Sequence, residues 1–258
     1  MKASLILSVY KNVTNLEAIV HSLERQTEQD FELIISEDGE DVAMKEWIDG
    51  YTFPWPMQHL TQPDEGWRKN RMLNRSIIAS RATWLIFVDG DCVLHPRFVE
   101  MHLKLSGKGR VLAGKRVKLN PTLSAKLLAG QKPCWLRYLL FPNGCKLVEE
   151  AFFSPFLHLF RKRVKHLTGS NMSMCKDDIL AINGFDENYV LPAIGEDYDI
   201  EWRLPANGCQ IISVRNLAVQ YHLYHPENWI DDSVNMQYFE QVYKQNLIIC
   251  KNGINKDK

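Results

Sequence analysis

Apolar and polar positions alternate in blocks over the first part of the chain. Nearly continuous apolar runs at 3–10, 31–36 and 83–91 predict strands that are buried on both faces. Segments with apolar residues at helical spacing lie between these runs, and Thr14 and Glu17 fit a capping box at the start of the first helix. Strands that alternate with helices predict an α/β fold with a largely parallel sheet, in which ligands bind at the carboxyl ends of the strands.

The pattern is less regular in the second part of the chain. Residues 120–165 mix proline, aromatic and basic residues without a steady period, so no element is predicted there. Gly184 is expected to end a helix that begins at Lys176, and Pro205 to limit a helix that begins near Glu196. The other predicted elements are helices at 96–105 and 233–249 and strands at 109–119, 209–214 and 217–222.

Composition narrows the classes of protein to which the chain can belong. Hydrophobic residues occupy 45% of the 258 positions, which is enough for a sizeable core, and no linker divides the chain, so we expect one domain over 1–258. Lys plus Arg equals Asp plus Glu at 31 each, so no global charge favours a nucleic-acid partner. The composition is therefore that of a globular protein without a bulk charge signal.

The cysteines and the N-terminal residues indicate in which cellular compartment the protein is expected to reside. The six cysteines show no CxxC spacing, and Met1 leads directly into a strand without a basic and apolar leader. A reducing cytosol is the simplest setting. No stretch approaches the ~20 apolar residues that span a bilayer, so any membrane contact is expected to be peripheral.

Acids follow the predicted strands at the points where ligands are expected. Glu37 and Asp38 end the second run, and Asp89 and Asp91 end the third, on either side of Gly90. Buried carboxylates are costly to desolvate unless they meet a cation or take part in chemistry. An Asp-x-Asp pair can hold a divalent ion together with a diphosphate, and Gly90 would let a nucleotide approach the backbone. The alternative to a metal site is that Asp89 and Asp91 are two ordinary surface acids.

The stretch "LIFVDGDCVL" fits two enzyme classes. It resembles the first motif of haloacid dehalogenase-type phosphatases, in which Asp89 would be the nucleophile and Asp91 the acid/base. In that family, however, the motif follows the first strand of the domain, whereas two or three strand–helix units precede it here.

Several motifs in order resemble family 2 inverting glycosyltransferases, which have the GT-A fold. They are "LILSVYKN", "IISEDGE", "GWRKNRMLNRSI", "FVDGDC" and "GSNMSMCKDDILAINGFDENYVLPAIGEDYDIEWRL", and the last is close to bacterial chondroitin-polymerase-like and galactosyltransferase-like catalytic domains. The chain departs from the usual pattern at Glu37, which replaces an Asp, and at Leu73 and Ser76, where Arg and Gly are usual. The resemblance extends from about residue 3 to about residue 225.

The resemblance implies a Rossmann-like mixed sheet flanked by helices, with a nucleotide-sugar half at 1–104 and an acceptor half at 105–258 that includes a C-terminal helix. It also implies a metal-dependent, inverting hexosyl- or N-acetylhexosaminyltransferase that uses a UDP-sugar to extend a saccharide in bacterial surface polysaccharide or lipopolysaccharide synthesis. The phosphatase and a non-catalytic glycan- or nucleotide-binding relative are the alternatives.

The resemblance assigns a set of residues to the donor. Val9, Glu37 and Asp38 would contact uracil and ribose, because carboxylates accept hydrogen bonds from a base N–H or a ribose hydroxyl. The segment "EDG" could instead be a simple turn. Basic residues on the basic helix near 68–71 would face phosphate, with a solvated helix face as the alternative. Asn74 could equally cap or brace a loop. The full donor set is Val9, Glu37, Asp38, Arg68, Lys69, Arg71, Asn74, Asp89, Gly90 and Asp91.

Asp197 is the expected general base that takes the acceptor proton, and Glu196 would hold the acceptor. A helix start that is rich in acids is the alternative explanation for this pair. Asn171 and Trp202 are the other expected acceptor contacts.

A histidine after the last predicted strand would complete the metal site with Asp91. The motif favours His222 over His225, and imidazole suits Mn²⁺ better than Mg²⁺. A structural histidine is the alternative.

Residues 131–166 combine aromatic residues with Arg161, Lys162, Arg163 and Lys165. We favour an acceptor-side subdomain with a solvated basic run, and a peripheral contact with an anionic membrane leaflet near a lipid-linked acceptor is the alternative. Trp135, Trp202 and Trp229 could stack on sugars or pack in the core. The expected location is cytoplasmic.

Overall fold

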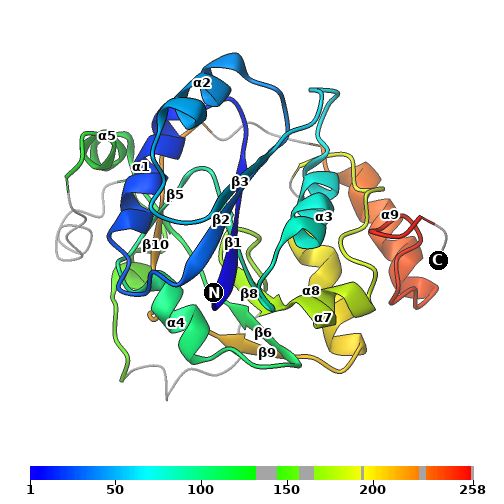
Figure 1. The fold of residues 1–258 in the computed structure, drawn as a ribbon. Helices are drawn as coiled ribbons and strands as arrows, with labels where there is room; N and C mark the ends of the chain where they lie inside the picture. The colour runs from blue at the N-terminus through cyan, green and yellow to red at the C-terminus, as the bar shows by residue number, and fades with distance from the viewer. Residues whose placement is uncertain (132–143, 157–165, 193–194, 227–230, 257–258) are drawn as a thin grey trace.

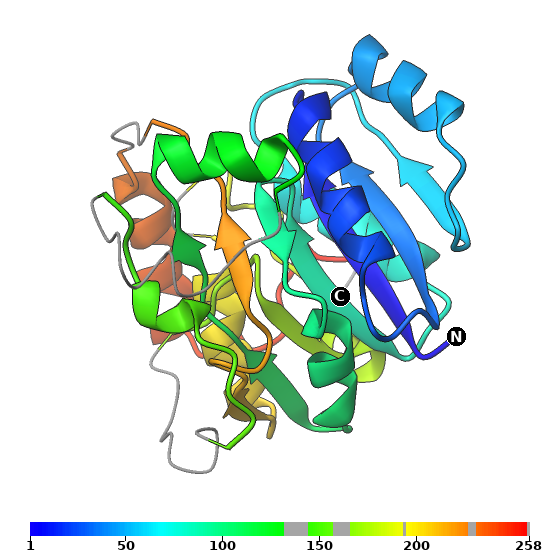
Figure 2. The same ribbon diagram turned by 90° about the vertical axis from the view of Figure 1, so that its left-hand side faces the viewer.

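The computed structural model describes residues 1–131, 144–156, 166–192, 195–226 and 231–256 of the chain. Within these residues, two sheets and flanking helices form a layered α/β structure (Figures 1 and 2). Seven of the described strands form the larger sheet in the order β3 (Met57–Leu60), β2 (Phe31–Glu37), β1 (Ala3–Val9), β4 (Trp84–Asp89), β8 (Met172–Cys175), β6 (Arg110–Ala113) and β9 (Gln210–Ser213).

The larger sheet is mixed. Strands β3, β2, β1 and β4 run parallel to one another, whereas β8 runs antiparallel to both of its neighbours, and β9 runs parallel to β6. The carboxyl ends of β1, β2 and β4 therefore lie at one edge of the sheet, where the sequence places its acids. The predicted α/β class with a mixed sheet is confirmed.

Helices cover both faces of this sheet (Figure 1). The described residues form α1 (Val13–Glu24), α2 (Val42–Gly50), α3 (Lys69–Ala79), α4 (Phe98–Lys104), α5 (Pro121–Leu128), the 3-10 helix η1 (Val148–Ala151), α7 (Lys176–Ala181), α8 (Glu196–Ala206) and α9 (Ser233–Lys244). Side chains of β1 alternate between the faces: Leu5 packs in a core with α1, α2 and α4, and Ile6 in a second core with α3, α7 and α8. Burial on both faces explains the continuous apolar runs.

A smaller sheet extends from the end of β4. Its described strands are β5 (Cys92–Leu94), β10 (Gln220–His222) and β7 (Val117–Lys118), in that order. His222 pairs with Cys92 on one side and with Lys118 on the other. This register places His222 beside the turn that carries Asp91.

Three details of the predicted elements are wrong. Asn12 rather than Thr14 caps α1, since the Asn12 side chain accepts the N–H of Asn15 at 3.0 Å and asparagine is the stronger N-cap. The expected strand at 109–119 is divided into β6 and β7, which belong to different sheets. The helix predicted to end at Gly184 ends earlier: α7 stops at Ala181, and Asn183, with a φ of +66°, precedes Gly184, with a φ of +77°, in the left-handed region.

No helix within the described ranges is both long and apolar enough to cross a membrane. Trp135, Trp229 and the basic residues Arg161, Lys162, Arg163 and Lys165 lie outside the described residues. The division of the chain at residue 104 stays a prediction.

Candidate active site

A cleft of about 720 Å³ opens at the carboxyl ends of β1, β2 and β4. Its position follows from the parallel strands, whose carboxyl ends meet at one edge of the sheet. The described residues that line it are Ser8, Val9, Tyr10, Asn12, Asn15, Ser36, Asp38, Asp64, Gly66, Trp67, Lys69, Met72, Asp89, Gly90, Asp91, Pro192 and His225. The cleft contains six of the ten residues predicted to bind the donor.

Asp38 enters the cleft in a fixed orientation. One carboxylate oxygen accepts Gln62 Nε2 at 2.6 Å, and the other accepts the backbone N–H of Arg68 at 2.7 Å. Each oxygen keeps a further lone pair for a ligand. The Arg68 side chain lies outside the cleft lining, where it bonds Glu65 and the carbonyl of Pro63.

Glu37 does not reach the cleft, so its predicted contact with the donor is wrong. The last residue of β2 is fully buried, and its Oε2 lies 2.6 Å from Nε2 of His59. Its Oε1 accepts the N–H of Asp41 at 2.8 Å, at the start of α2. Glu37 therefore joins β2 to its neighbours, while Asp38, one residue later, faces the cleft.

The two acids of Asp-Gly-Asp point to different partners. Asp89 accepts Lys69 Nζ at 2.7 Å and lies 3.6 Å from Arg116 Nη1. Asp91 faces the histidines instead. Gly90 donates its N–H to the carbonyl of Ser8, and a Cβ at this position would lie 2.8 Å from that oxygen. The close contact with β1 therefore requires glycine at position 90, whether or not a ligand also approaches the backbone there.

Asp91, His222 and His225 form a cluster that could hold a metal ion, since their ligand atoms all lie within 4.8 Å of one another. Asp91 Oδ2 lies 3.1 Å from His222 Nε2 and 3.6 Å from His225 Nε2. Burial opposes ionisation of Asp91, but the hydrogen bond and charge of His222 hold its pKa well below the usual range. Both histidines left open by the sequence thus converge on one carboxylate.

Lys69 joins the end of β4 to the start of α8. Its Nζ lies 2.7 Å from Asp89 Oδ1 and 2.6 Å from Glu196 Oε1. Burial opposes the charge of Lys69, but the two carboxylates raise its pKa. The pKa of Glu196 is lowered, because Lys69 outweighs the effect of burial. Both groups are therefore charged at neutral pH.

Asp197 differs from its neighbour Glu196. Burial, followed by the charge of Glu196, raises the pKa of Asp197 to about 6, although Gly169 donates its N–H to Oδ2 at 3.1 Å. The raised pKa opposes the effect expected of a helix N-terminus, which favours a charged acid. A carboxylate with a pKa near 6 can exchange a proton close to neutral pH.

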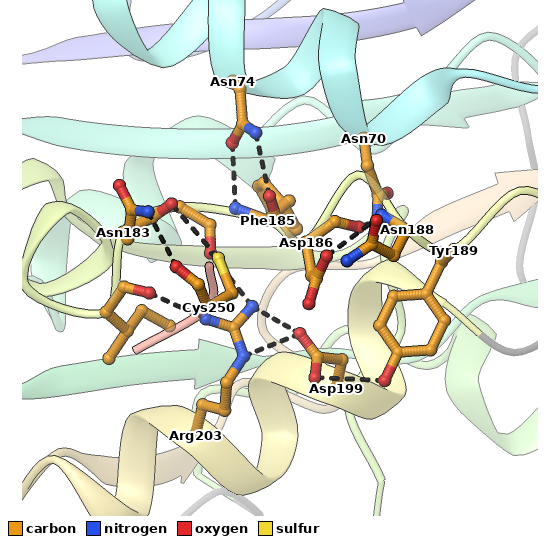
Figure 3. A network of polar contacts seen from close by, with 12 residues as sticks. Asn70, Asn74, Asn183, Phe185, Asp186, Asn188, Tyr189, Asp199, Arg203 and Cys250 are labelled. Carbon is orange, nitrogen blue, oxygen red and sulfur yellow. Dashed lines mark hydrogen bonds and ion pairs between the residues drawn. The ribbon is translucent and has the colours of Figure 1, made fainter. Parts of the chain in front are cut away.

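Other predicted ligands of the donor lie away from the cleft. Asn74 is buried, and its amide bonds the backbone of Phe185 through both Nδ2 and Oδ1, each at 2.8 Å (Figure 3). The predicted donor contact of Asn74 is therefore wrong. Arg71 is exposed on α3 and is not part of the cleft lining.

The predicted acceptor contact of Asn171 is also wrong. Asn171 is fully buried, where its Oδ1 bonds His102 and its Nδ2 bonds the carbonyls of Lys115 and Ala218. Trp202 lies on α8 with its ring centroid 5.3 Å from that of Tyr243 on α9. Its role toward an acceptor stays a prediction.

Two site residues were not found from the sequence. Arg116, beside Asp89, stands in the short segment between β6 and β7 that was expected to be one strand. Tyr10 lines the cleft directly after β1 and is 55% exposed. The spacing of Tyr10 after a buried strand is the signal that could have identified it.

The chain belongs to Glycosyl transferase family 2, whose pattern matches residues 4–167. This membership overturns the phosphatase interpretation of Asp89, which is also inconsistent with the position of β4 after three strands of the sheet. The predicted family is confirmed.

A curated relative is validoxylamine A glucosyltransferase of Streptomyces hygroscopicus subsp. jinggangensis (strain 5008), which is 23% identical over 227 residues. The match covers 80% of this chain and 51% of the relative, so the chain spans about half the length of that protein.

Solved glycosyltransferase structures share the fold. S. aureus TarS 1-349 in complex with UDP-GlcNAc has a TM-score of 0.63 at 14% identity, over 95% of this chain and 65% of that one. The mannosyltransferase PcManGT from Pyrobaculum calidifontis, in complex with GDP-Man and Mn²⁺, has a TM-score of 0.58 at 9% identity. That match covers 88% of this chain and 58% of PcManGT. The predicted GT-A fold is confirmed.

Proposed function

We propose that this protein transfers a hexosyl or N-acetylhexosaminyl group from a UDP-sugar to a hydroxyl of a saccharide acceptor, with inversion and with a divalent metal ion. The observation that carries the proposal is the arrangement of charged groups around the cleft. Lys69 lies between Asp89 on the donor side and Glu196, next to Asp197. Lys69, which lines the cleft, thus connects Asp89 with the helix start that carries the proposed base, although Glu196 and Asp197 are not part of the cleft lining.

The residues present fit a divalent metal. One carboxylate and two imidazoles are the donor set that Mn²⁺ and similar ions accept, and Asp91, His222 and His225 supply it. When bound, such an ion would neutralise the negative charge that develops on the departing diphosphate. Asp91 is ionised at neutral pH, as a ligand must be.

Asp197 is proposed as the general base. Above pH ~6 its carboxylate is ionised and can take the proton of the attacking acceptor hydroxyl. Glu196 is held ionised by Lys69 and therefore accepts hydrogen bonds, which suits it to hold an acceptor hydroxyl rather than to take a proton. The neighbouring acids thus have separate roles because their environments differ.

The donor nucleotide is proposed to lie along β1 and β2. Asp38 is the acid at the end of the cleft near β2, and Val9 and Tyr10 line the wall next to it. A relative in fold has been solved with UDP-GlcNAc and another with GDP-Man, so the choice of uracil is a proposal specific to this chain.

The acceptor is proposed to be a saccharide or a lipid-linked saccharide of a bacterial surface polysaccharide or lipopolysaccharide. We further propose a cytoplasmic enzyme that works at the inner face of the membrane when the acceptor is lipid-linked. Support comes from membership of Glycosyl transferase family 2.

The test combines nucleotide binding with turnover. Calorimetry with UDP and GDP, each with and without Mn²⁺, is expected to show tighter binding of UDP in the presence of the metal. Hydrolysis of a panel of UDP-sugars then reports turnover without knowledge of the acceptor. If UDP and GDP bind equally well, with or without Mn²⁺, the donor assignment is contradicted. If nucleotide binding depends on the metal but no donor or acceptor is turned over, the protein is a non-catalytic binding relative.

A further inference from the structure

We propose that Arg203 is a positioning residue: together with Asp199 it fixes the first turn of α8 against α3, so that Glu196 and Asp197 face Lys69. The inference rests on the proposed function, because it concerns the placement of the proposed base. It assigns a role to a buried ion pair that is not part of the cleft lining.

Arg203 is the most constrained charged residue of α8. Its side chain is 0% exposed, and its Nε donates to Asp199 Oδ2 at 2.7 Å, one helical turn earlier. Nη1 donates to the carbonyl of Ile182 at 2.9 Å, and Nη2 donates to that of Gly184 at 3.0 Å (Figure 3). The planar guanidinium thus joins α8 to the turn that follows α7.

The same turn is held by α3 from the other side. Asn74 bonds the N–H and the carbonyl of Phe185, and Asn70 donates to the carbonyl of Asp186 at 2.7 Å (Figure 3). Asn70 directly follows Lys69 in the chain. The turn at 182–186 therefore connects the helix that carries Lys69 with the helix that carries the acids.

Tyrosine side chains complete the network. Tyr189 donates its hydroxyl to Asp199 Oδ1 at 3.2 Å, and Tyr238 on α9 donates to Asp186 Oδ2 at 2.8 Å. The two rings lie edge to face with centroids 5.1 Å apart. Asp199 thus has partners on both oxygens, and its orientation is fixed.

The two ends of this path meet at the active site. Lys69 Nζ lies 2.6 Å from Glu196 Oε1, so the contacts run from Lys69 through α3, the turn and Arg203 back to Glu196. A closed path of this kind fixes the distance between the two helix starts. Displacement of a catalytic group by ~1 Å can lower a rate by about 10²-fold.

Stability alone is a weak reason for the ion pair. Desolvation of a buried Arg and Asp offsets most of their attraction, and apolar residues of similar volume often replace such pairs without loss of stability. A positional role makes a different prediction, because apolar replacements would keep the fold but lose the bonds to Ile182 and Gly184.

The groups that face Asp197 determine how its titration reports on position. They are Glu196 beside it, Lys69 on α3, Asp89 on β4 and Lys115 after β6, together with the N–H of Gly169. If the first turn of α8 moves away from these groups and into water, the pKa of Asp197 falls toward the ordinary value of an aspartate.

The experiment compares Arg203→Lys with the double variant Asp199→Leu/Arg203→Met. The measurements are the 13C NMR titration of the Asp197 carboxyl without donor or metal, kcat as a function of pH, UDP affinity with Mn²⁺, and the melting temperature. Ile19→Ala, in the core on the opposite face of the sheet, is the control for a loss of stability alone.

We expect both variants to lower kcat by about 10²-fold. We also expect them to lower the pKa of Asp197 from about 6, with UDP affinity unchanged. Ile19→Ala should change neither kcat nor the pKa of Asp197. The proposal is overturned if a folded Arg203 variant keeps the wild-type kcat and the wild-type pKa of Asp197, or if neither variant folds. It is also overturned if Ile19→Ala, at an equal melting temperature, gives the same changes. A fall of UDP affinity in parallel with kcat would overturn it as well. A wild-type protein without turnover would refute the proposed function, whereas the NMR titration would still decide the role of Arg203.

Discussion

Lys69 Nζ lies 2.6 Å from Glu196 Oε1, although the two residues begin helices from different halves of the chain. The same ammonium bonds Asp89 at 2.7 Å, so one cation bonds an acid at the end of β4 and an acid at the start of α8. Removal of this cation would leave two carboxylates facing each other in a partly buried site.

Lys69→Met should lower the free energy of unfolding by about 2 kcal/mol, because removing one partner of a partly buried ion pair leaves Glu196 without its ammonium partner, while Asp89 keeps Arg116. The matched control is Lys45→Met, whose ion pair with Asp49 is exposed. It should change the free energy of unfolding by less than about 0.5 kcal/mol. Urea unfolding followed by circular dichroism measures both, and equal effects of the two variants would contradict the role of Lys69.

The rate should rise with pH through about 6, because Asp197 must lose its proton before it can act as a base. Asp197→Asn should lower kcat by ~10²–10⁴-fold and remove this limb of the pH profile while UDP still binds. Asp177→Asn, at an exposed position on α7, is the matched control and should keep the wild-type profile. Full activity of Asp197→Asn would refute the proposed mechanism.

Asp197→Asn should also stabilise the protein at pH 7. A carboxyl whose pKa is raised in the folded state binds its proton more tightly there than in the unfolded chain, so its contribution to stability is lost as pH rises through about 6. An amide carries no such dependence. Thermal unfolding at pH 4 and pH 7 should show a gain only at the higher pH, and a gain at both would indicate another cause.

His222→Ala and His225→Ala should each weaken the Mn²⁺-dependent part of UDP binding by about 10-fold or more, because each removes an imidazole from the cluster around Asp91. Binding of UDP in the presence of EDTA should be the same for both variants and wild type. His21→Ala on α1 is the control. Calorimetry measures these affinities, and an unchanged Mn²⁺ effect in both variants would show that the ion binds elsewhere.

Glu37→Ala and Asp38→Ala should separate a structural acid from a ligand. Loss of the Glu37 bonds to His59 and Asp41 should cost about 1–3 kcal/mol of stability and leave UDP affinity unchanged. Asp38→Ala should instead weaken UDP binding. The opposite pattern, measured by calorimetry and urea unfolding, would restore Glu37 as the donor contact.

The strands and their terminal acids could be predicted because their signals are local. The apolar runs that became β1, β2 and β4 are nearly continuous, and acids that follow such runs lie at the carboxyl edge of the sheet. The same reasoning placed Asp89 and Asp91 at that edge, and these predictions depend on chain direction and periodicity alone. Asp197, in the first turn of α8, was assigned instead from the resemblance to family 2 glycosyltransferases.

The errors concern residues whose partners are distant in the chain. Glu37, Asn74 and Asn171 were assigned to ligands, but each is buried against His59, Phe185 or His102. No local pattern distinguishes a buried polar side chain with an internal partner from one that awaits a ligand. Arg203 was missed for the same reason, since its role depends on the turn after α7.

The central position of β4 depends on β8, which runs antiparallel beside it. Without β8, the strand that ends in Asp89 would have unpaired N–H and carbonyl groups along a long apolar edge, and such edges promote aggregation. Cleavage or truncation between the two halves would therefore not release an intact nucleotide-binding fragment. Residues 172–175 pair with the edge of β4 and so protect the strands that carry the proposed donor site, and they come from the same later part of the chain as the proposed base.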